Sequence, residues 1–297
     1  MFRVNTNKLA GIKSATNHTT VKLEQIDENT LNRAFDISIN RVINYKYNKK
    51  NTVLVICGPT ATGKTKLALE LAKEFDGELI SADSRQVYVG NDIETGKDKD
   101  LIGDSRIWLL DIINSNQDFS VSLWRRLALE AIKDILSRGK LPIVVGGSGL
   151  YIKALVQNLP DVDIPRDKKL RKSNKSVSEL LDYLKKIDLK KAESLNNSDR
   201  NNPRRLVRAI EIAQCPSPKL GEGLRVRYLQ IGLTAPKQYL EEKIRKRVIK
   251  RGLDPSFVQK EINIMKKQLV WFKKQPDIVW FDIMKPWRRK LKSIIKP

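Results

Sequence analysis

The sequence predicts an α/β fold built on a doubly wound parallel sheet with a small helical inserted lobe. Apolar stretches of strand length alternate with amphipathic helical stretches, and the connections between them are short, which favours parallel strands covered by helices. The run Gly58-Pro59-Thr60-Ala61-Thr62-Gly63-Lys64-Thr65 fits the phosphate-binding pattern G-x-x-x-x-G-K-[ST] at every fixed position. Together these observations indicate a core of the P-loop NTPase-like class.

The phosphate-binding motif lies between a predicted strand and a predicted helix. Residues 53–57 are continuously apolar, and residues 66–73 carry apolar side chains at helical spacing. Glycine lets the loop curl so that N–H groups and the helix N-terminus face one anion, while Lys64 adds a positive charge and the Thr65 hydroxyl can bind Mg²⁺. The motif therefore predicts a bound polyphosphate, with an ordinary glycine turn as the alternative. It does not say whose phosphates are held.

A second predicted strand, residues 77–82, runs directly into four polar residues. Asp83, Ser84, Arg85 and Gln86 would lie at the carboxyl edge of the sheet, which is where ligands bind in open α/β folds. The alternative for Asp83 is a helix N-cap, a position that aspartate favours.

The next elements complete the alternation. Residues 107–113 predict a third strand, and residues 120–138 predict a helix with Ser120 as its N-cap and Gly139 as its stop. Residues 141–145 predict a fourth strand that ends in the turn 146–149, Gly-Gly-Ser-Gly. Because this turn lies at the carboxyl end of a strand, Ser148 would face the same crevice as the phosphate loop. The glycines of the turn would allow a ligand to approach the backbone closely. A tight turn without a ligand is the alternative.

Two later helices carry clusters of arginine and lysine. One opens at Pro203, and the other is expected to be capped by Thr234 and stopped at Gly252. The second helix holds a basic run from residue 243 to residue 251, which is either a solvated face or a set of phosphate contacts.

Composition limits the function classes. The chain has 57 Lys plus Arg against 34 Asp plus Glu, so its net charge of +23 favours a polyanionic partner, although a merely soluble, lysine-rich surface is the alternative. Two cysteines and one histidine exclude a disulfide framework and histidine triads, and indicate a reducing compartment. No apolar run reaches the length of a membrane span, so we expect a soluble protein of the cytoplasm.

The expected organisation has four parts. Residues 1–50 form a basic N-terminal extension, partly helical or disordered, whose first 23 residues lack acidic side chains; organellar targeting is therefore an alternative to the cytoplasm. Residues 51–161 form the P-loop core, 162–202 a short helical insert, and 203–297 complete the core and add basic C-terminal helices.

Several motifs, in order, resemble the tRNA dimethylallyltransferases of the IPP transferase family. They are residues 58–65, 80–88, 138–155 and 202–211, and the segments 231–234 and 268–272 extend the likeness toward the C-terminus. The resemblance covers roughly residues 51 to 285. It implies transfer of a dimethylallyl group from dimethylallyl diphosphate to N6 of the adenosine 3′ of the anticodon, position 37 of the tRNA, with release of pyrophosphate.

The resemblance also implies roles for individual residues. Asp83 matches the catalytic aspartate, Ser148 stands where the family usually carries threonine, and Lys64 with the rest of Gly58–Thr65 would hold the diphosphate together with Arg208. Thr65 would bind Mg²⁺, the expected cofactor. The residues expected to contact tRNA are Asp83, Ser84, Arg85, Gln86, Ser148, Arg171, Arg204, Arg205, Leu206, Val207 and Arg208. We expect a monomer.

The chain departs from the family pattern, and two other functions stay open. Between Lys260 and Gln268 the sequence passes directly through a stretch where the family inserts helices that touch tRNA, and the lobe 162–202 is short. A P-loop small-molecule or nucleotide kinase, which would bind ATP, could use Asp111 as its strand-end Mg²⁺ ligand. A non-catalytic RNA-binding derivative of the transferase is the third possibility.

Overall fold

The computed structural model describes residues 52–90, 92–97, 102, 106–157, 159–215 and 224–295, so the expectations for residues 1–50 lie outside the described chain. Six strands form one sheet in the order β3-β2-β4-β1-β5-β6, and all neighbours are parallel. The strands are β1 (Thr52–Cys57), β2 (Gly77–Ser81), β3 (Ile107–Trp108), β4 (Leu141–Val145), β5 (Arg227–Thr234) and β6 (Ile278–Asp282). The α/β class and the doubly wound parallel sheet are confirmed.

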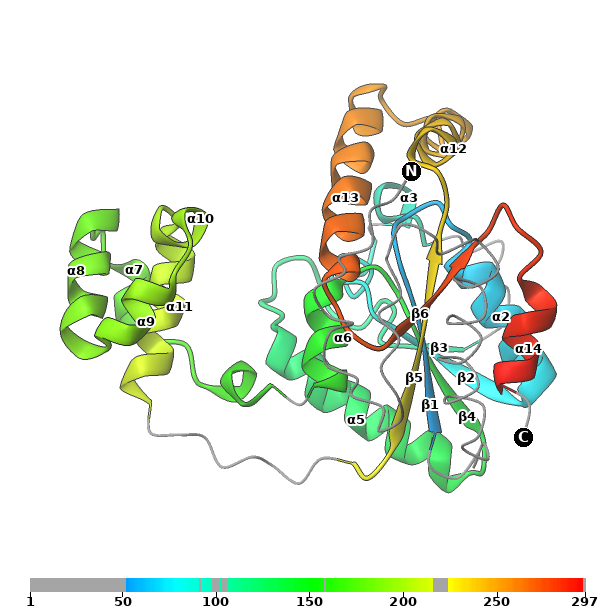
Figure 1. Ribbon diagram of the computed structural model, residues 1–297, viewed down its shortest axis with the longest axis horizontal. Helices are drawn as coiled ribbons and strands as arrows, with labels where there is room; N and C mark the ends of the chain where they lie inside the picture. Colours follow the sequence, from blue (N-terminus) through cyan, green and yellow to red (C-terminus); the bar gives the residue numbers. More distant parts are fainter. Residues whose placement is uncertain are drawn as a thin grey trace, which may run out of the picture. The chain divides into compact units, whose positions relative to one another are not determined.

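Helices cover both faces of the sheet (Figure 1). Helix α2 (Lys64–Phe75) lies on one face, and α5 (Val121–Ser137) and α6 (Gly149–Val156) lie on the other. All six residues of β1 are buried, which explains why it reads as a continuous apolar run rather than an alternating one. The phosphate loop therefore starts from the most deeply buried strand of the sheet.

The predicted helix over residues 120–138 is confirmed at both ends. The Ser120 hydroxyl accepts a hydrogen bond from Leu123 N at 3.1 Å, which satisfies one of the free N–H groups of the first turn of α5. The last residue of α5 is Ser137; Arg138 is its C-cap, and Gly139 follows with a φ of +72° that suits glycine.

Two sequence expectations for these elements are wrong. The third strand stops at Trp108, because Leu109 and Asp111 adopt left-handed φ angles of 62° and 54° that no strand accommodates; residue 113 makes only an isolated bridge to Tyr88. Thr234 is not a helix cap but the last residue of β5. Helix α12 (Lys237–Lys250) begins three residues later, after Pro236.

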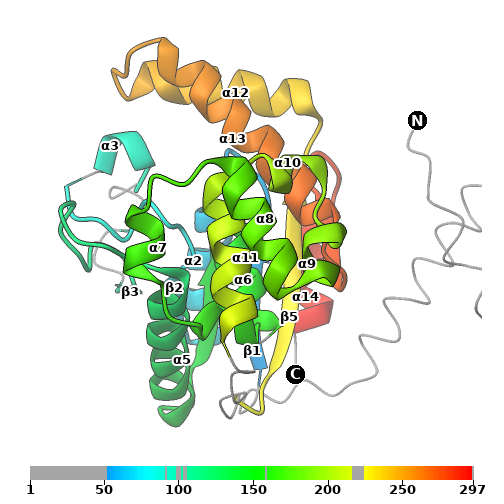
Figure 2. The ribbon, with the colours of Figure 1, turned by 90° about the vertical axis from the view of Figure 1, so that its left-hand side faces the viewer.

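A helical lobe follows α6 in the chain. It contains the 3₁₀ turn η4 (Pro160–Asp163) and the helices α7 (Lys168–Lys172), α8 (Val177–Ile187), α9 (Leu189–Ser194), α10 (Asn197–Arg200) and α11 (Pro203–Gln214). Figure 2 shows α11 alongside α8, and the two share with α9 an apolar cluster of Leu180, Leu184, Ala192, Leu206, Val207, Ala209 and Ile210. Helix α11, which the sequence analysis grouped with the core, thus packs with the helices of the insert.

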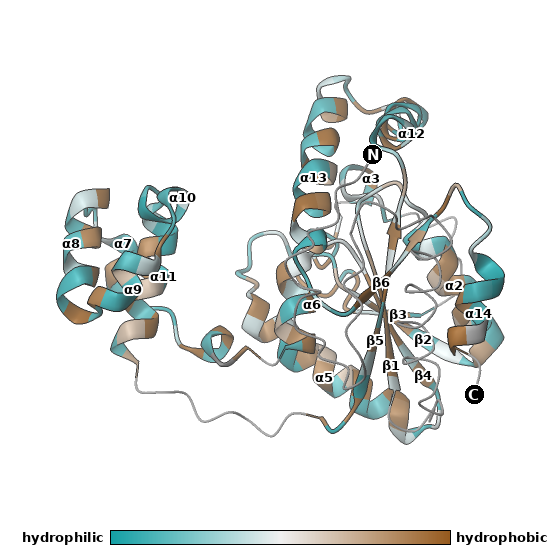
Figure 3. Cartoon of the chain, in the orientation of Figure 1, coloured by the Kyte–Doolittle hydropathy of each residue, from teal (hydrophilic) through white to brown (hydrophobic). Residues whose placement is uncertain are grey.

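Two further helices, α12 and α13 (Ser256–Lys273), pack on each other through Leu240, Ile244, Val248, Ile262 and Met265. Helix α13 runs without a break from Lys260 to Gln268. Apolar residues concentrate in the strands, whereas α12 is largely hydrophilic on its outside (Figure 3).

The last helix, α14 (Arg288–Ile295), is tied to α2 by an ion pair between Lys292 and Glu74 at 2.8 Å and a second between Arg288 and Glu70. Among the described residues, no helix combines the length and the apolarity needed to cross a bilayer.

Candidate active site

Three turns meet at the carboxyl edge of neighbouring strands, as the sequence analysis expected. The loop after β1, the turn after β2 and the turn after β4 all line one cavity of about 660 Å³. Its lining includes Lys64 and Thr65 from the first, Asp83 and Gln86 from the second, and Ser148 from the third. Helices α12 and α13 and the segment 94–97 supply further parts of the wall.

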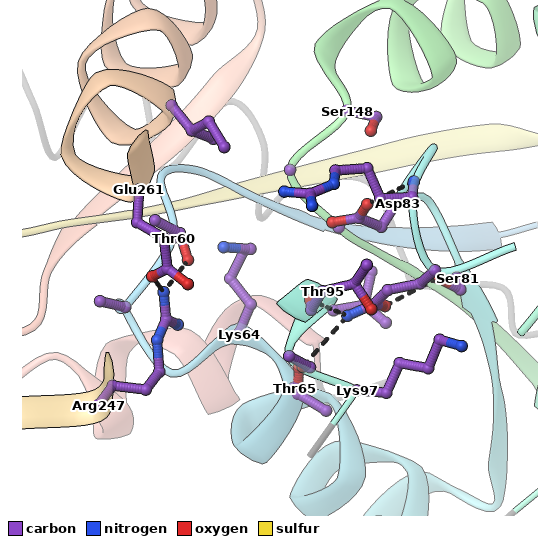
Figure 4. A pocket seen from close by; sticks show the side chains of 18 of the residues that line it. Thr60, Lys64, Thr65, Ser81, Asp83, Thr95, Lys97, Ser148, Arg247 and Glu261 are labelled. Carbon is purple, nitrogen blue, oxygen red and sulfur yellow. Dashed lines mark hydrogen bonds and ion pairs between the residues drawn. The ribbon is translucent and has the colours of Figure 1, made fainter. Parts of the chain in front are cut away.

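Two cationic side chains lie at the phosphate loop, one from the loop's own end and one from α12. Lys64 Nζ donates to Pro59 O at 2.7 Å, and Arg247 Nη2 from α12 donates to Thr60 Oγ1 at 2.8 Å. Burial, and then the positive charge of Arg247, lower the pKa of Lys64 to about 8, although Asp83 and Cys57 oppose the shift. Figure 4 shows Lys64 between the Thr60–Arg247 pair and Asp83. Two nearby cations, of which Lys64 has a lowered pKa, favour a bound anion.

One nitrogen of Arg247 supports the same conclusion. Its guanidinium forms an ion pair with Glu261 of α13, yet its Nε is buried without a hydrogen-bond partner, the only such side-chain atom among the described residues. A buried donor without an acceptor is costly, so Nε suits an acceptor oxygen that a ligand brings.

The opposite wall holds the carboxylate. Asp83 Oδ1 accepts from Arg85 N at 2.9 Å, so its side chain is held within a turn and does not cap a helix. Ser148 Oγ accepts from Ser84 N at 2.8 Å and donates to Ser84 Oγ at 3.2 Å. Ser148 therefore fixes the turn that carries Asp83.

Gln86 is held by the loop that follows. Its Nε2 donates to Thr95 O and Gly96 O, both at 3.2 Å. The next residue, Lys97, has a fully buried side chain whose Nζ donates to Tyr88 O at 2.6 Å and pairs with Asp92 at 2.9 Å and with Asp111. The carboxylate of Asp111 is thus occupied by an internal ion pair.

The glycines of the turn after β4 are required by the protein's own packing. A Cβ on Gly146 would lie 2.2 Å from Ala82 O, one on Gly147 2.2 Å from Gln268 Nε2, and one on Gly149 2.0 Å from Trp271. These glycines therefore allow the turn to approach the end of β2 and α13 closely. Gly146 and Gly147 also line the cavity, and the expectation that they let a ligand approach the backbone stays a prediction.

Comparisons with known proteins agree with this geometry. A family model described as IPP transferase matches residues 86–254. The chain belongs to the IPP transferase family. It is 41% identical over 221 residues to a tRNA dimethylallyltransferase of Acetivibrio thermocellus, covering 68% of this chain and 70% of that protein, and 35% identical over 284 residues to one of Anoxybacillus flavithermus, covering 78% and 90%.

A solved relative supports the same assignment. The crystal structure of the full-length tRNA isopentenylpyrophosphate transferase of Bacillus halodurans is 30% identical, with a TM-score of 0.56 over 82% of this chain and 94% of that one. A eukaryotic dimethylallyltransferase acting on tRNA shares the fold, with a TM-score of 0.68 at 22% identity.

In this IPP transferase, the arginine expected to reach the diphosphate lies elsewhere. Arg208 Nη1 donates to Ile164 O at 3.0 Å and to Glu211 at 2.8 Å, and Nη2 donates to Asp161 O. Arg171 pairs with the same Glu211 through two hydrogen bonds of 2.6 and 2.8 Å. Although burial opposes it, these bonds hold the pKa of Glu211 at about 2. Both arginines thus serve the lobe.

The other expected tRNA contacts divide by exposure. Arg204 and Arg205 are exposed at the start of α11, whereas Leu206 and Val207 are 0% and 7% exposed in the lobe's apolar cluster. These two side chains pack in the lobe's cluster with α8, and a contact between them and tRNA stays a prediction.

Sequence reasoning did not single out Arg247. It lies in the basic run 243–251, which was interpreted as either a solvated face or a set of phosphate contacts, and the structure places it in direct contact with the phosphate loop. Helical spacing alone places Lys243 and Arg247 on one face of α12, and both line the cavity, so the spacing was the available signal.

Proposed function

We propose that this IPP transferase moves a dimethylallyl group from dimethylallyl diphosphate to N6 of the adenosine 3′ of the anticodon in tRNA, releasing pyrophosphate. One observation carries the proposal: Lys64 and Arg247 lie at the phosphate loop, where they would hold the diphosphate, and the Asp83 carboxylate lines the same cavity. Alkylation of an amine requires a leaving group on the donor and an acceptor for the amine proton. The names of the relatives support the same substrates.

The N6 lone pair of adenine forms a bond to the allylic C1 as the C1–O bond breaks, and that electron pair leaves with the diphosphate. The N6 proton passes to Asp83. Lys64 and Arg247 stabilise the charge that develops on the leaving oxygen. Holding the weakly nucleophilic amine against C1 removes much of the barrier.

The residues present suit Mg²⁺. The Thr65 hydroxyl lines the cavity at the start of α2, beside the place where the diphosphate would sit, and a hydroxyl with phosphate oxygens is a donor set that this hard cation accepts. Bound there, Mg²⁺ would neutralise part of the diphosphate charge.

The target base has to leave the anticodon stack to enter this cavity. We propose that residues 83–86 and Ser148 contact the base and its neighbours, and that the exposed Arg204 and Arg205 contact the backbone, with the lobe held in place by Arg171 and Arg208. We further propose that the protein acts as a monomer in the cytoplasm.

The two alternatives have less support. A kinase would use Asp111 for Mg²⁺, but that carboxylate is paired with the buried Lys97. A non-catalytic derivative would explain the uninterrupted α13, yet it leaves the cation pair and Asp83 without a purpose.

Incubation with Mg²⁺, labelled dimethylallyl diphosphate and unmodified tRNA, followed by digestion and mass spectrometry, tests the proposal. We expect N6-prenyl adenosine with the wild type and none with Asp83→Ala. ATP consumption without prenyl transfer would favour a kinase.

A further inference from the structure

Gln268 joins the two halves of the cavity. Its Oε1 accepts a hydrogen bond from Thr60 N at 2.8 Å, and its Nε2 donates to Gly147 O at 3.1 Å. Thr60 belongs to the phosphate loop, and Gly147 immediately precedes Ser148. A single side-chain amide therefore connects the loop that holds the leaving group with the turn that supports Asp83.

The amide orientation follows from the partners. A backbone N–H can only donate and a backbone carbonyl can only accept, so the side chain has to present oxygen to Thr60 and nitrogen to Gly147. A carboxylate of the same shape would accept from Thr60 but would have no hydrogen for Gly147. A thioether of similar length would make neither bond well.

The helix holds Gln268 firmly in this position. Met265 lies nearly one turn before it and packs in the cluster between α12 and α13, while Phe272 lies one turn after it and packs in the main core. Both are essentially fully buried, at 0% and 1% exposed. Two buried neighbours on one helical stripe leave the glutamine little freedom to move.

The turn after β4 packs tightly against α13. A Cβ on Gly147 would lie 2.2 Å from Gln268 Nε2, and one on Gly149 would lie 2.0 Å from the Trp271 ring. The helix, the turn and the phosphate loop are in direct contact, so a shift in one is passed to the others.

We propose that Gln268 is a positioning residue that sets the separation between the phosphate loop and the Ser148–Asp83 side of the cavity, and with it the alignment of N6, C1 and the leaving oxygen. The inference rests on the proposed prenyl transfer. Misplacing reacting groups by about an ångström costs about a hundredfold in rate, so the effect should be seen in the chemical step.

Gln268→Met and Gln268→Glu test this against matched controls. Gln259→Met and Gln259→Glu make the same changes on an exposed position of α13, where the amide contacts only the Asn263 side chain among the hydrogen bonds of the described residues. The measurement is the single-turnover rate of prenyl transfer with both substrates saturating, together with the KM of each substrate and the melting temperature.

We expect a ten- to hundredfold loss of single-turnover rate in both Gln268 variants, with either KM changed by less than about threefold, and wild-type rates in both Gln259 variants. A folded Gln268→Met with the wild-type rate would overturn the inference, as would a loss confined to the KM of dimethylallyl diphosphate, which would make Gln268 a direct ligand.

Unfolding of a variant and inactivity of the wild type can each be told apart from a loss of positioning. Should Gln268→Met melt below the assay temperature, Gln268→Asn, which keeps both hydrogen-bonding groups on a shorter side chain, gives the same test. Inactive wild type would contradict the proposed function itself, before any variant is compared.

Discussion

The lowered pKa of Lys64 predicts how diphosphate affinity depends on pH. Burial and Arg247 hold this pKa at about 8, well below the usual value for lysine. Below pH 8 most of the free enzyme has a charged Lys64. Above pH 8 most of it has a neutral Lys64, so Lys64 must take up a proton when the diphosphate binds. The affinity should therefore fall as pH rises through 8.

The magnitude follows from the titration. With a pKa of about 8, roughly nine-tenths of Lys64 is charged at pH 7 and roughly one-tenth at pH 9, so Kd should rise about tenfold across this interval. A phosphate ester titrates near pH 6, so dimethylallyl diphosphate itself changes little over that range.

The assay is calorimetric titration of the diphosphate in the absence of tRNA. Arg247→Met removes the second cause of the shift, so its affinity should be weaker at pH 7 but should begin to fall only at higher pH. Arg251 lies 3.9 Å from Glu261, so this carboxylate keeps a positive neighbour when Arg247 is replaced. Lys73→Met, which alters an exposed lysine of the same helix outside the described lining of the cavity, should leave the profile unchanged. A Kd that is the same from pH 7 to pH 9 would contradict the dependence of affinity on the Lys64 charge. So would an Arg247→Met variant whose affinity begins to fall at the same pH as that of the wild type.

Three other predictions concern stability and tRNA binding. Glu211→Gln should destabilise the fold by about 2 kcal/mol in urea unfolding, less than for a fully buried pair because both arginine partners reach water. Since the pKa of Glu211 is about 2 when folded, its contribution should be complete above pH 4.5 and fade as the pH falls toward 2; an acid-insensitive wild type would contradict this. Gly146→Ala should lower the urea midpoint more than Gly147→Ala, because its new Cβ meets the backbone of Ala82 rather than the end of a side chain; equal losses would count against it. Affinity for tRNA, measured by filter binding, should fall about a thousandfold between 50 and 200 mM salt if six or more phosphates are contacted, and a flat response would contradict a backbone interface.

Sequence reasoning predicted the features that depend on local chemistry. The phosphate loop, the cap at Ser120 and the stop at Gly139 are each set by residues within one turn of the chain. The meeting of Asp83 and Ser148 also followed, because parallel strands end at the same edge of a sheet.

The features that sequence reasoning missed depend on contacts between distant residues. The strand expected through residue 113 is interrupted where Asp111 turns to reach Lys97, and no apolar pattern reports an ion pair. Leu206 and Val207 sit within a basic motif, yet the amphipathic stripe of α11 buries them. Gln268 and Thr60 are 208 residues apart, so their contact could not be read from spacing.

The central claim is that the phosphate loop holds a leaving group rather than a nucleotide that is hydrolysed. Its most direct test is the stoichiometry of pyrophosphate release measured against prenylated adenosine in one reaction with dimethylallyl diphosphate, Mg²⁺ and tRNA. We expect one pyrophosphate for each prenylated adenosine, no release without tRNA, and no ATP requirement. Pyrophosphate released without prenylated adenosine, or activity that depends on ATP, would contradict the central claim.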